Sequence, residues 1–250
     1  MAWTPPLTLK EKLKKYIVPP KIYIKALVKM HLRKGEDELH LLPFLTNKHK
    51  DSIDIGANKG VFSYLLSKLS SRVHAFEPNP KMYDILKRMG RNNILTYQVA
   101  LSSKTGFASL LVPMDEKTKT FSNEGATLSK VNVSGANKSV DVEIKTLDSY
   151  SFDNIGFIKI DVEGYEMEVL KGAVETLKKN KPILLVELEE SHTKRPIMNL
   201  IKEIEGYGYR AAFLRKKQIT DISLFDAQTY HKNPKTTEDY VFNFLFFPIS

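Results

Sequence analysis

The segment of this chain best suited to bind a ligand is a glycine-rich turn between an apolar run and a helix-like run. Residues 54–60 read DIGANKG. Glycines let the backbone amides of such a turn approach a ligand that a Cβ atom would hold away. The spacing is D-x-G-x-x-x-G, whereas dinucleotide sites prefer G-x-G-x-x-G, with a helix N-terminus facing a pyrophosphate. The turn therefore predicts a nucleotide-type cofactor without a phosphate. S-adenosylmethionine is such a molecule, and Asp54 would serve its ammonium group.

A second acidic residue follows at the distance expected for a ribose contact. The strand-like run 73–76 ends at Glu77, 23 residues after Asp54, where a carboxylate can accept hydrogen bonds from both ribose hydroxyls. Asn79 and Pro80 are expected to cap and start the next helix. A glycine-rich turn alone is often only a tight loop, but strand, turn, helix, strand and acid in this order favour a cofactor site.

Further titratable side chains gather after two later strand-like runs. Asp161 and Glu163 follow the run 157–160. Four more lie at or just beyond the end of the run 183–188, namely Glu187, Glu189, Glu190 and His192. Ligands of parallel α/β sheets bind outside the carboxyl ends of the strands. These residues are therefore expected to form an acidic rim beside the cofactor.

The positions of these residues depend on an alternation of strand-like and helix-like segments. Strands are expected at 52–55, 73–76, 94–100, 157–160, 183–188, 209–214 and 240–247. Helices are expected at 61–69, 80–91, 167–177 and 197–204. The alternation predicts an α/β, Rossmann-like class I fold with a mainly parallel seven-stranded sheet. The last two strands have no helix between them and should pair antiparallel, as in methyltransferases and unlike dehydrogenases.

Residues 107–147 interrupt this alternation between the third and fourth strands. They hold three strand-like pieces, 108–112, 126–131 and 140–144, around the polar loop 113–125. Such a β insertion commonly shapes a substrate pocket or acts as a lid.

The positive charge of the chain is concentrated at its beginning. The net charge is +9, and residues 1–34 hold nine Lys or Arg against one Glu. We expect residues 1–48 to form a basic helical extension and 49–250 the catalytic domain. Four basic residues recur every fourth position, namely Lys21, Lys25, Lys29 and Arg33. The helix that carries them either packs on the domain with a solvated basic edge, or meets an anionic membrane or an acidic partner.

Composition excludes several classes of function. The chain has no cysteine, which excludes a disulfide framework, a thiolate zinc site and cysteine nucleophiles such as those that methylate C5 of cytosine. No run approaches the length of an apolar membrane span, and a signal peptide's apolar region is missing. We expect a cytoplasmic protein, soluble or peripheral at the inner membrane face.

Five motifs together resemble the FkbM family of S-adenosylmethionine-dependent methyltransferases. They are DIGANKG at 54–60, AFEPNP at 75–80, TLD at 146–148, IKIDVEGYE at 158–166 and LKGA at 170–173. The resemblance covers roughly residues 50–190. It implies O-methylation of a hydroxyl, often on a sugar or a polyketide-type metabolite.

The resemblance also implies roles for individual residues. The methionine end of the cofactor would be lined by Asp54, Gly56, Asn58 and Gly60. Glu77 would bind the ribose, and residues from Ala100 to Ser102 would lie near the adenine. Asp161 would sit beside the transferable methyl group.

Transfer to a sugar hydroxyl requires help with deprotonation, because such a hydroxyl ionises far above neutral pH. His192 is one candidate base by its intrinsic pKa, and Asp161 or Glu163 is another if burial or carboxylate repulsion raises its pKa. Alternatively, Asp161 with Glu187 or Glu189 would hold Mg²⁺, which lowers the pKa of the hydroxyl.

Three other functions remain as alternatives. The basic beginning of the chain suggests a nucleic-acid methyltransferase, but the N-P-P-Y or D-P-P-Y run that amino-nitrogen methyltransferases use to orient a flipped base is missing. A binding protein could keep the cofactor fold without turnover. A nicotinamide dehydrogenase is opposed by the missing G-x-G-x-x-G. The sequence therefore favours an O-methyltransferase whose acceptor is a small molecule or a glycan precursor.

Overall fold

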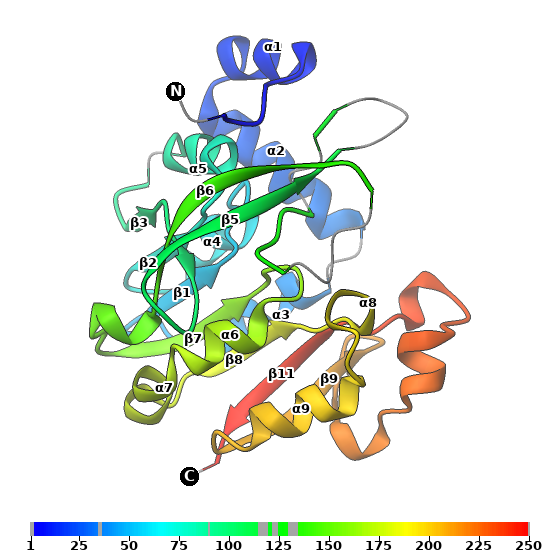
Figure 1. The fold of residues 1–250 in the computed structure, drawn as a ribbon. Helices are drawn as coiled ribbons and strands as arrows, with labels where there is room; N and C mark the ends of the chain where they lie inside the picture. Colours follow the sequence, from blue (N-terminus) through cyan, green and yellow to red (C-terminus); the bar gives the residue numbers. More distant parts are fainter. Residues whose placement is uncertain are drawn as a thin grey trace.

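A central β-sheet runs through the protein (Figure 1), and the predicted site residues lie at or just after the carboxyl ends of its parallel strands. The computed structural model describes residues 3–34, 37–89, 91–114, 120–121, 125–129 and 135–249. Within these residues the sheet has the strand order β10-β9-β11-β8-β7-β1-β2-β3. The strands are β1 Asp51–Ile55, β2 Val73–Phe76, β3 Ile94–Tyr97, β7 Ile155–Ile160, β8 Ile183–Glu187, β9 Tyr209–Arg215, β10 Gln218–Asp221 and β11 Asn243–Pro248.

The pairing of these strands confirms the predicted fold class. β1 pairs in parallel with β2 and β7, and parallel pairing continues outward to β3 and β8. β11 lies between β8 and β9 and is antiparallel to both. The polar strand β10 forms a hairpin with β9 and adds an edge strand to the seven that were predicted.

Helices cover both faces of the sheet because successive strand residues point to opposite sides. Ile53, Ile55 and Ile158 pack with α6 Glu166–Lys171, α7 Val174–Asn180 and α9 Ile197–Glu205. Phe157 and Leu185 pack on the other face with α3 Glu38–Leu45 and α4 Val61–Leu66. The remaining helices are α1 Leu9–Ile17, α2 Pro20–Lys34, α5 Pro80–Lys87 and α8 Glu190–Thr193, with short helical turns at Leu147–Tyr150, Ile222–Leu224, Gln228–Lys232 and Thr237–Asp239.

The third predicted strand, 94–100, was too long. β3 ends at Tyr97, and Ala100–Leu101 forms the separate strand β4, which pairs with β6 Asn137–Lys145. β6 also pairs antiparallel with β5 Gly106–Pro113, so the insertion builds a small second sheet. Of the predicted piece 126–131, the described part adds only a single bridge, from Leu111 to Thr127. Residues 130–131 and much of the loop 113–125 lie outside the described residues.

The predicted helix 167–177 is two helices, and two others are shorter than expected. α6 stops at Gly172, where the backbone passes close to Ser102, and α7 starts again beyond it. Asp148 accepts hydrogen bonds from the amides of Glu175 and Thr176 and so caps the new start. Val174, the first residue of α7, is 38% exposed, whereas an unbroken helix over 167–177 would place it on the apolar side with Met167, Leu170 and Leu177. The helices predicted at 61–69 and 80–91 end at 66 and 87.

The second helix of the chain, α2, packs on α4, which covers one face of the sheet. Its Ile24 and Val28 are buried in a cluster that includes Tyr64 and Met89. The basic residues Lys21, Lys25, Lys29 and Arg33 are exposed. This is the arrangement expected of a packed helix with a solvated basic edge. Among the helices of the described residues, none combines the length and hydrophobicity needed to cross a bilayer.

Replacement of Gly172 by alanine is expected to lower the free energy of unfolding. A Cβ atom at this position would lie 2.0 Å from the backbone oxygen of Ser102, and relief of such overpacking costs about 1–3 kcal/mol. Urea denaturation of Gly172→Ala measures the loss. Gly125→Ala is the control, because its Cβ would meet its nearest neighbour at 3.6 Å. Equal stability of the two variants would contradict the proposed close approach.

Candidate active site

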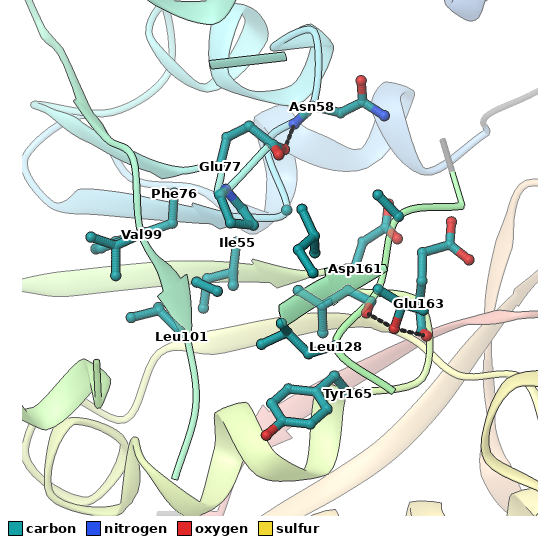
Figure 2. Close-up of a pocket in the computed structure, with 17 residues that line it drawn as sticks. Ile55, Asn58, Phe76, Glu77, Val99, Leu101, Leu128, Asp161, Glu163 and Tyr165 are labelled. Carbon is teal, nitrogen blue, oxygen red and sulfur yellow. Dashed lines mark hydrogen bonds between the residues drawn. The ribbon is translucent and has the colours of Figure 1, made fainter. Parts of the chain in front are cut away.

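A cleft lies at the carboxyl ends of β1, β2 and β7 (Figure 2). It has two parts, one with a mainly apolar lining and one with a mainly charged lining. The part that we call the cofactor cleft has an apolar wall formed by Phe76, Val99, Ala100, Leu101, Leu110 and Leu128. Gly56, Asn58, Glu77 and Tyr165 complete it. An adjoining hollow, the acidic lobe, is lined by Asp54, Lys159 and Glu187. Asp161 and Glu163 line both parts.

Glu77 is held in the cofactor cleft by the backbone of the neighbouring turns. Its Oε2 accepts a hydrogen bond from the amide of Asn58 at 2.7 Å (Figure 2). Its Oε1 accepts one from the amide of Asn79 at 2.8 Å. Burial raises the pKa of Glu77 to about 7, against the lowering effect of these two bonds. Each oxygen retains a lone pair, so the carboxylate can still accept hydrogen bonds from a diol.

Two buried oxygens near the first turn have no hydrogen-bond partner in the described structure. They are Asp54 Oδ1 and Asn58 Oδ1. The other oxygen of Asp54 accepts a hydrogen bond from the Ser63 hydroxyl. A buried acceptor without a donor costs free energy. The unpartnered oxygens thus fit a ligand that carries an ammonium group.

The glycines of this turn serve packing within the protein. A Cβ on Gly56 would lie 1.7 Å from the backbone oxygen of Asp161, so glycine allows the end of β1 to approach the end of β7. Gly60 has φ +82°, and a Cβ there would lie 2.0 Å from Met89 Cε. The reasoning from sequence assigned these glycines to ligand approach. The structure shows that intramolecular contacts already require them.

The predicted adenine residues divide between the wall and its support. Ala100 lines the cofactor cleft together with Leu101. Ser102 is fully buried behind this wall, and its hydroxyl lies 3.2 Å from the hydroxyl of Tyr165. Ser102 therefore does not line the cleft itself and supports Tyr165, which does.

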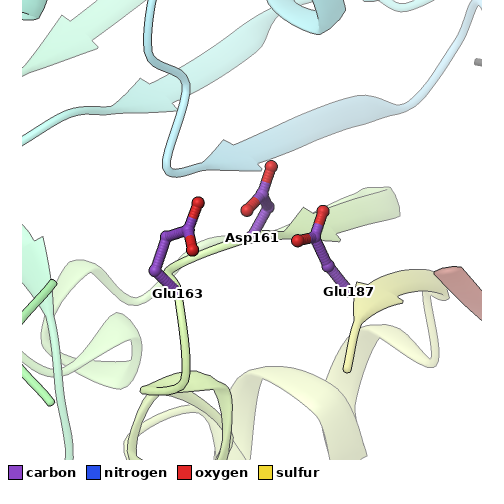
Figure 3. Close-up of side chains that lie close together, drawn as sticks. All are labelled: Asp161, Glu163 and Glu187. Carbon is purple, nitrogen blue, oxygen red and sulfur yellow. The ribbon is translucent and has the colours of Figure 1, made fainter. Parts of the chain in front are cut away.

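Three carboxylates converge at the ends of β7 and β8 (Figure 3). Oxygens of Asp161, Glu163 and Glu187 lie within 4.8 Å of one another, which is close enough to share a metal ion. Burial, followed by the charge of Asp161, raises the pKa of Glu163 to about 8 and that of Glu187 to about 9. Glu189 was the other metal ligand considered from the sequence. It lies outside this group and faces His192, with 3.9 Å between Oε2 and Nε2.

Lys159 supplies a positive charge inside this acidic region. Its Nζ donates a hydrogen bond to Asp161 Oδ2 at 2.7 Å and lies 4.6 Å from the centre of the Phe62 ring. Burial alone would lower the pKa of Lys159, but the charges of Asp161, Asp54 and Glu187 raise it above its ordinary value. Lys159 is therefore an ammonium ion that partly neutralises the carboxylates around it.

The loop after β7 turns Glu163 into the cleft. Glu163 has φ +58° and Gly164 has φ +92°, two consecutive residues in the left-handed region. Glu166 braces this turn by accepting hydrogen bonds from the amides of Val162 and Gly164. Glu163 Oε2 then lies 3.5 Å from Nδ1 of His192, which comes from α8. A strained backbone that positions an acid is common at functional sites.

Lys159 and His31 are among the residues of the acidic lobe that the reasoning from sequence missed. Lys159 stands two residues before Asp161 in a strand, so the two-residue period alone places both side chains on one face. His31 also lines the lobe, together with Leu27, and both come from α2. No local signal predicts that contact, because it depends on how α2 docks against the sheet.

Comparisons with known proteins agree with this geometry. The sequence profile of the family described as "Methyltransferase FkbM domain" matches residues 54–211. The chain belongs to the FkbM methyltransferase family. The family resemblance expected from the motifs is thus confirmed, and the match extends beyond them to β9.

Two curated relatives of this FkbM protein are also named as methyltransferases. Methyltransferase sdnD of Sordaria araneosa is 32% identical over 189 residues, which cover 62% of this chain and 72% of that protein. Hexuronic acid methyltransferase AglP of Haloferax volcanii is 28% identical over 179 residues, covering 69% and 70% respectively. The crystal structure of an FkbM methyltransferase from Methylobacillus flagellatus matches with a TM-score of 0.51 and 16% identity, covering 80% of this chain and 44% of that one. This structural likeness supports the class I fold.

The raised pKa values predict that stability falls as the pH rises above neutral. Glu163 and Glu187 stay protonated in the folded protein to about pH 8 and 9 but ionise near 4.5 when unfolded. Their stabilisation is complete below the unfolded value and is lost as pH rises through the folded value. Each contributes a decrease of up to about 1.4 kcal/mol per pH unit.

Urea denaturation between about pH 6.5 and 9, in EDTA and without cofactor, measures this slope. Glu163→Gln should reduce the slope by the contribution of Glu163, since the amide does not titrate, while Glu187 continues to contribute. Glu175→Gln removes an exposed carboxylate on α7 and should leave the slope unchanged. A free energy of unfolding that increases with pH over this range would contradict the burial of protonated carboxyl groups.

Proposed function

We propose that this protein is an S-adenosylmethionine-dependent O-methyltransferase that acts on a hydroxyl of a sugar, a glycan precursor or a related metabolite. The main support for the proposal is that the cofactor cleft adjoins the acidic lobe in a chain that belongs to the FkbM family. The cleft has one feature for each of three parts of this cofactor. The Glu77 carboxylate suits the ribose diol, the unpartnered acceptor oxygens suit the ammonium group, and the apolar wall suits the adenine.

In this proposal, each part of the cofactor cleft binds one part of the methyl donor. Glu77 accepts hydrogen bonds from the ribose hydroxyls in the cofactor cleft. Asn58, together with Asp54 of the adjoining acidic lobe, accepts from the ammonium group. The apolar wall with Ala100 contacts the adenine. When bound, S-adenosylmethionine supplies a methyl group on a positively charged sulfur. The carboxylates at the end of β7 favour that positive charge.

Proton removal is assigned to the pair formed by Glu163 and His192. When bound, the sulfonium would supply a methyl carbon for in-line attack by the acceptor oxygen, with S-adenosylhomocysteine as the leaving group, and the hydroxyl proton would pass to the base. Glu163 has a pKa near the working range of a general base, and His192 lies 3.5 Å from it to accept the proton onward. Asp161 lines both the cofactor cleft and the acidic lobe. In this position it orients the acceptor.

A sugar acid is the acceptor class suggested by the name of one of the two curated relatives. The Haloferax volcanii relative is named for hexuronic acid, and the carboxylate of such an acceptor needs a cation in this acidic lobe. Lys59 lines the lobe beside Asn58 and provides one. A hexuronic acid should therefore be a better acceptor than the corresponding neutral hexose.

Metal assistance is the second candidate route for the same reaction, because three carboxylate oxygens lie within 4.8 Å of one another. Asp161, Glu163 and Glu187 would hold a Mg²⁺ ion, which would lower the pKa of the acceptor hydroxyl. The ammonium group of Lys159 weighs against this route, since it already neutralises part of the donor set.

Transfer of labelled methyl groups tests the reaction and its base. Purified protein is incubated with labelled S-adenosylmethionine and hexuronic acids, neutral hexoses, nucleotide sugars, oligosaccharides or RNA. Glu163→Gln should lower kcat by about 10²–10⁴-fold if the carboxylate takes the proton, and Glu175→Gln should not change it. Activity that survives EDTA would exclude the metal route, whereas activity restored by Mg²⁺ would support it. Label on RNA, or cofactor binding without transfer to any acceptor, would overturn the proposal.

Binding of S-adenosylhomocysteine tests the cofactor site separately. Glu77→Gln is expected to weaken binding at least tenfold, because an amide cannot accept with both of its polar atoms. Calorimetry measures the affinity without any acceptor. Glu168→Gln on α6 is the control, since Glu168 bonds Ser103 and Lys171 outside the cleft. Tighter binding of NAD than of S-adenosylhomocysteine would contradict the assignment.

A further inference from the structure

The N-terminal helix α1 is attached to the protein by its polar side. The Glu11 carboxylate lies 2.9 Å from Nζ of Lys81, whose side chain is only 4% exposed. The same Nζ donates a hydrogen bond to the backbone oxygen of Pro6 at 3.1 Å. Thr8 and Glu11 also form a capping box, since each side chain accepts a hydrogen bond from the backbone amide of the other. These contacts fix which side of α1 faces the domain.

The apolar side of α1 faces solvent as a result. Leu9, Leu13, Tyr16 and Ile17 fall within about 100° of one another on a helical projection, on the side away from Glu11. They are 76%, 52%, 80% and 71% exposed. Figure 1 shows α1 at the periphery of the molecule, at the end remote from β9 and β11. Helices of globular proteins normally turn their apolar stripe to the core, so this orientation requires another partner.

The charge around this apolar side suits an anionic surface. Residues 1–34 carry nine Lys or Arg and one Glu, and Glu11 is already paired with Lys81. Lys12 on α1 is exposed, as are Lys21, Lys25 and Lys29 on α2. Each basic residue near a membrane of anionic lipids adds attraction, and exposed apolar side chains enter the headgroup region.

We propose that α1 is an interfacial anchor that lies in the surface of a bilayer containing anionic lipids. The side chains of Leu9, Leu13, Tyr16 and Ile17 enter the boundary between headgroups and acyl chains. The salt bridge between Glu11 and Lys81 holds the rest of the protein against the anchor. The basic edge of α2 adds electrostatic attraction from the neighbouring helix.

Sedimentation with vesicles tests this anchor. The full chain should bind vesicles of phosphatidylcholine mixed with phosphatidylglycerol at least tenfold more strongly than vesicles of phosphatidylcholine alone. Ile17→Glu should reduce binding to the mixed vesicles at least tenfold. Leu224→Glu is the matched control, since Leu224 is 68% exposed in the turn Ile222–Leu224 after β10, outside α1 and α2, and it should bind like the wild type. Tyr16→Trp should show a blue shift of fluorescence only with the mixed vesicles.

Other results would overturn the proposal. Equal binding to both vesicle types, or no effect of Ile17→Glu, would exclude an anionic bilayer as the partner of this face. If the chain does not bind vesicles but forms a dimer that Ile17→Glu dissociates, a second copy of the chain covers α1. Salt-sensitive binding of RNA without vesicle binding would assign the basic residues to nucleic acid. Unchanged affinity of Ile17→Glu for S-adenosylhomocysteine verifies that the variant is folded and separates this test from the cofactor site.

Discussion

The ammonium group of Lys159 allows several carboxylates to lie close together at the carboxyl ends of the parallel strands. Asp54, Asp161 and Glu187 come from three neighbouring strands, and all lie close enough to act on the charge of this one lysine. A buried carboxylate without a counterion is costly, and removal of one partner of a buried pair costs about 3–5 kcal/mol. Because Asp161 borders both parts of the cleft, this one ion pair lies where, in the proposed function, the methyl donor and the acceptor hydroxyl would meet.

Much of the fold could be predicted because its signals are local. The turn 54–60, the strand ending at Glu77 and the cap at Asn79 each depend on a few neighbouring residues, and the structure has them where the motifs indicated. The antiparallel end of the sheet could be predicted because no helical pattern separates β9 from β11. Periodicity failed at Gly172, where a contact with Ser102 from another element breaks the helix.

The rest of the site depends on contacts between distant segments, which a single sequence does not display. The left-handed turn at Glu163 brings this acid beside Asp161 and Glu187, and strand alternation alone gave no reason to prefer it over Glu189. The approach of His31 depends on the docking of α2. The same holds for α1, whose sequence shows an amphipathic pattern but whose ion pair with Lys81 decides which side faces outward.

The hydroxyl of Thr127 joins the β insertion to the loop that carries Glu163. It donates a hydrogen bond to the backbone oxygen of Glu163 at 2.7 Å, while the backbone of Thr127 exchanges hydrogen bonds with Leu111 of β5. The β insertion and the backbone of Glu163 are therefore directly joined, so a shift of Thr127 that keeps this hydrogen bond would also shift the peptide unit from which the Glu163 side chain extends.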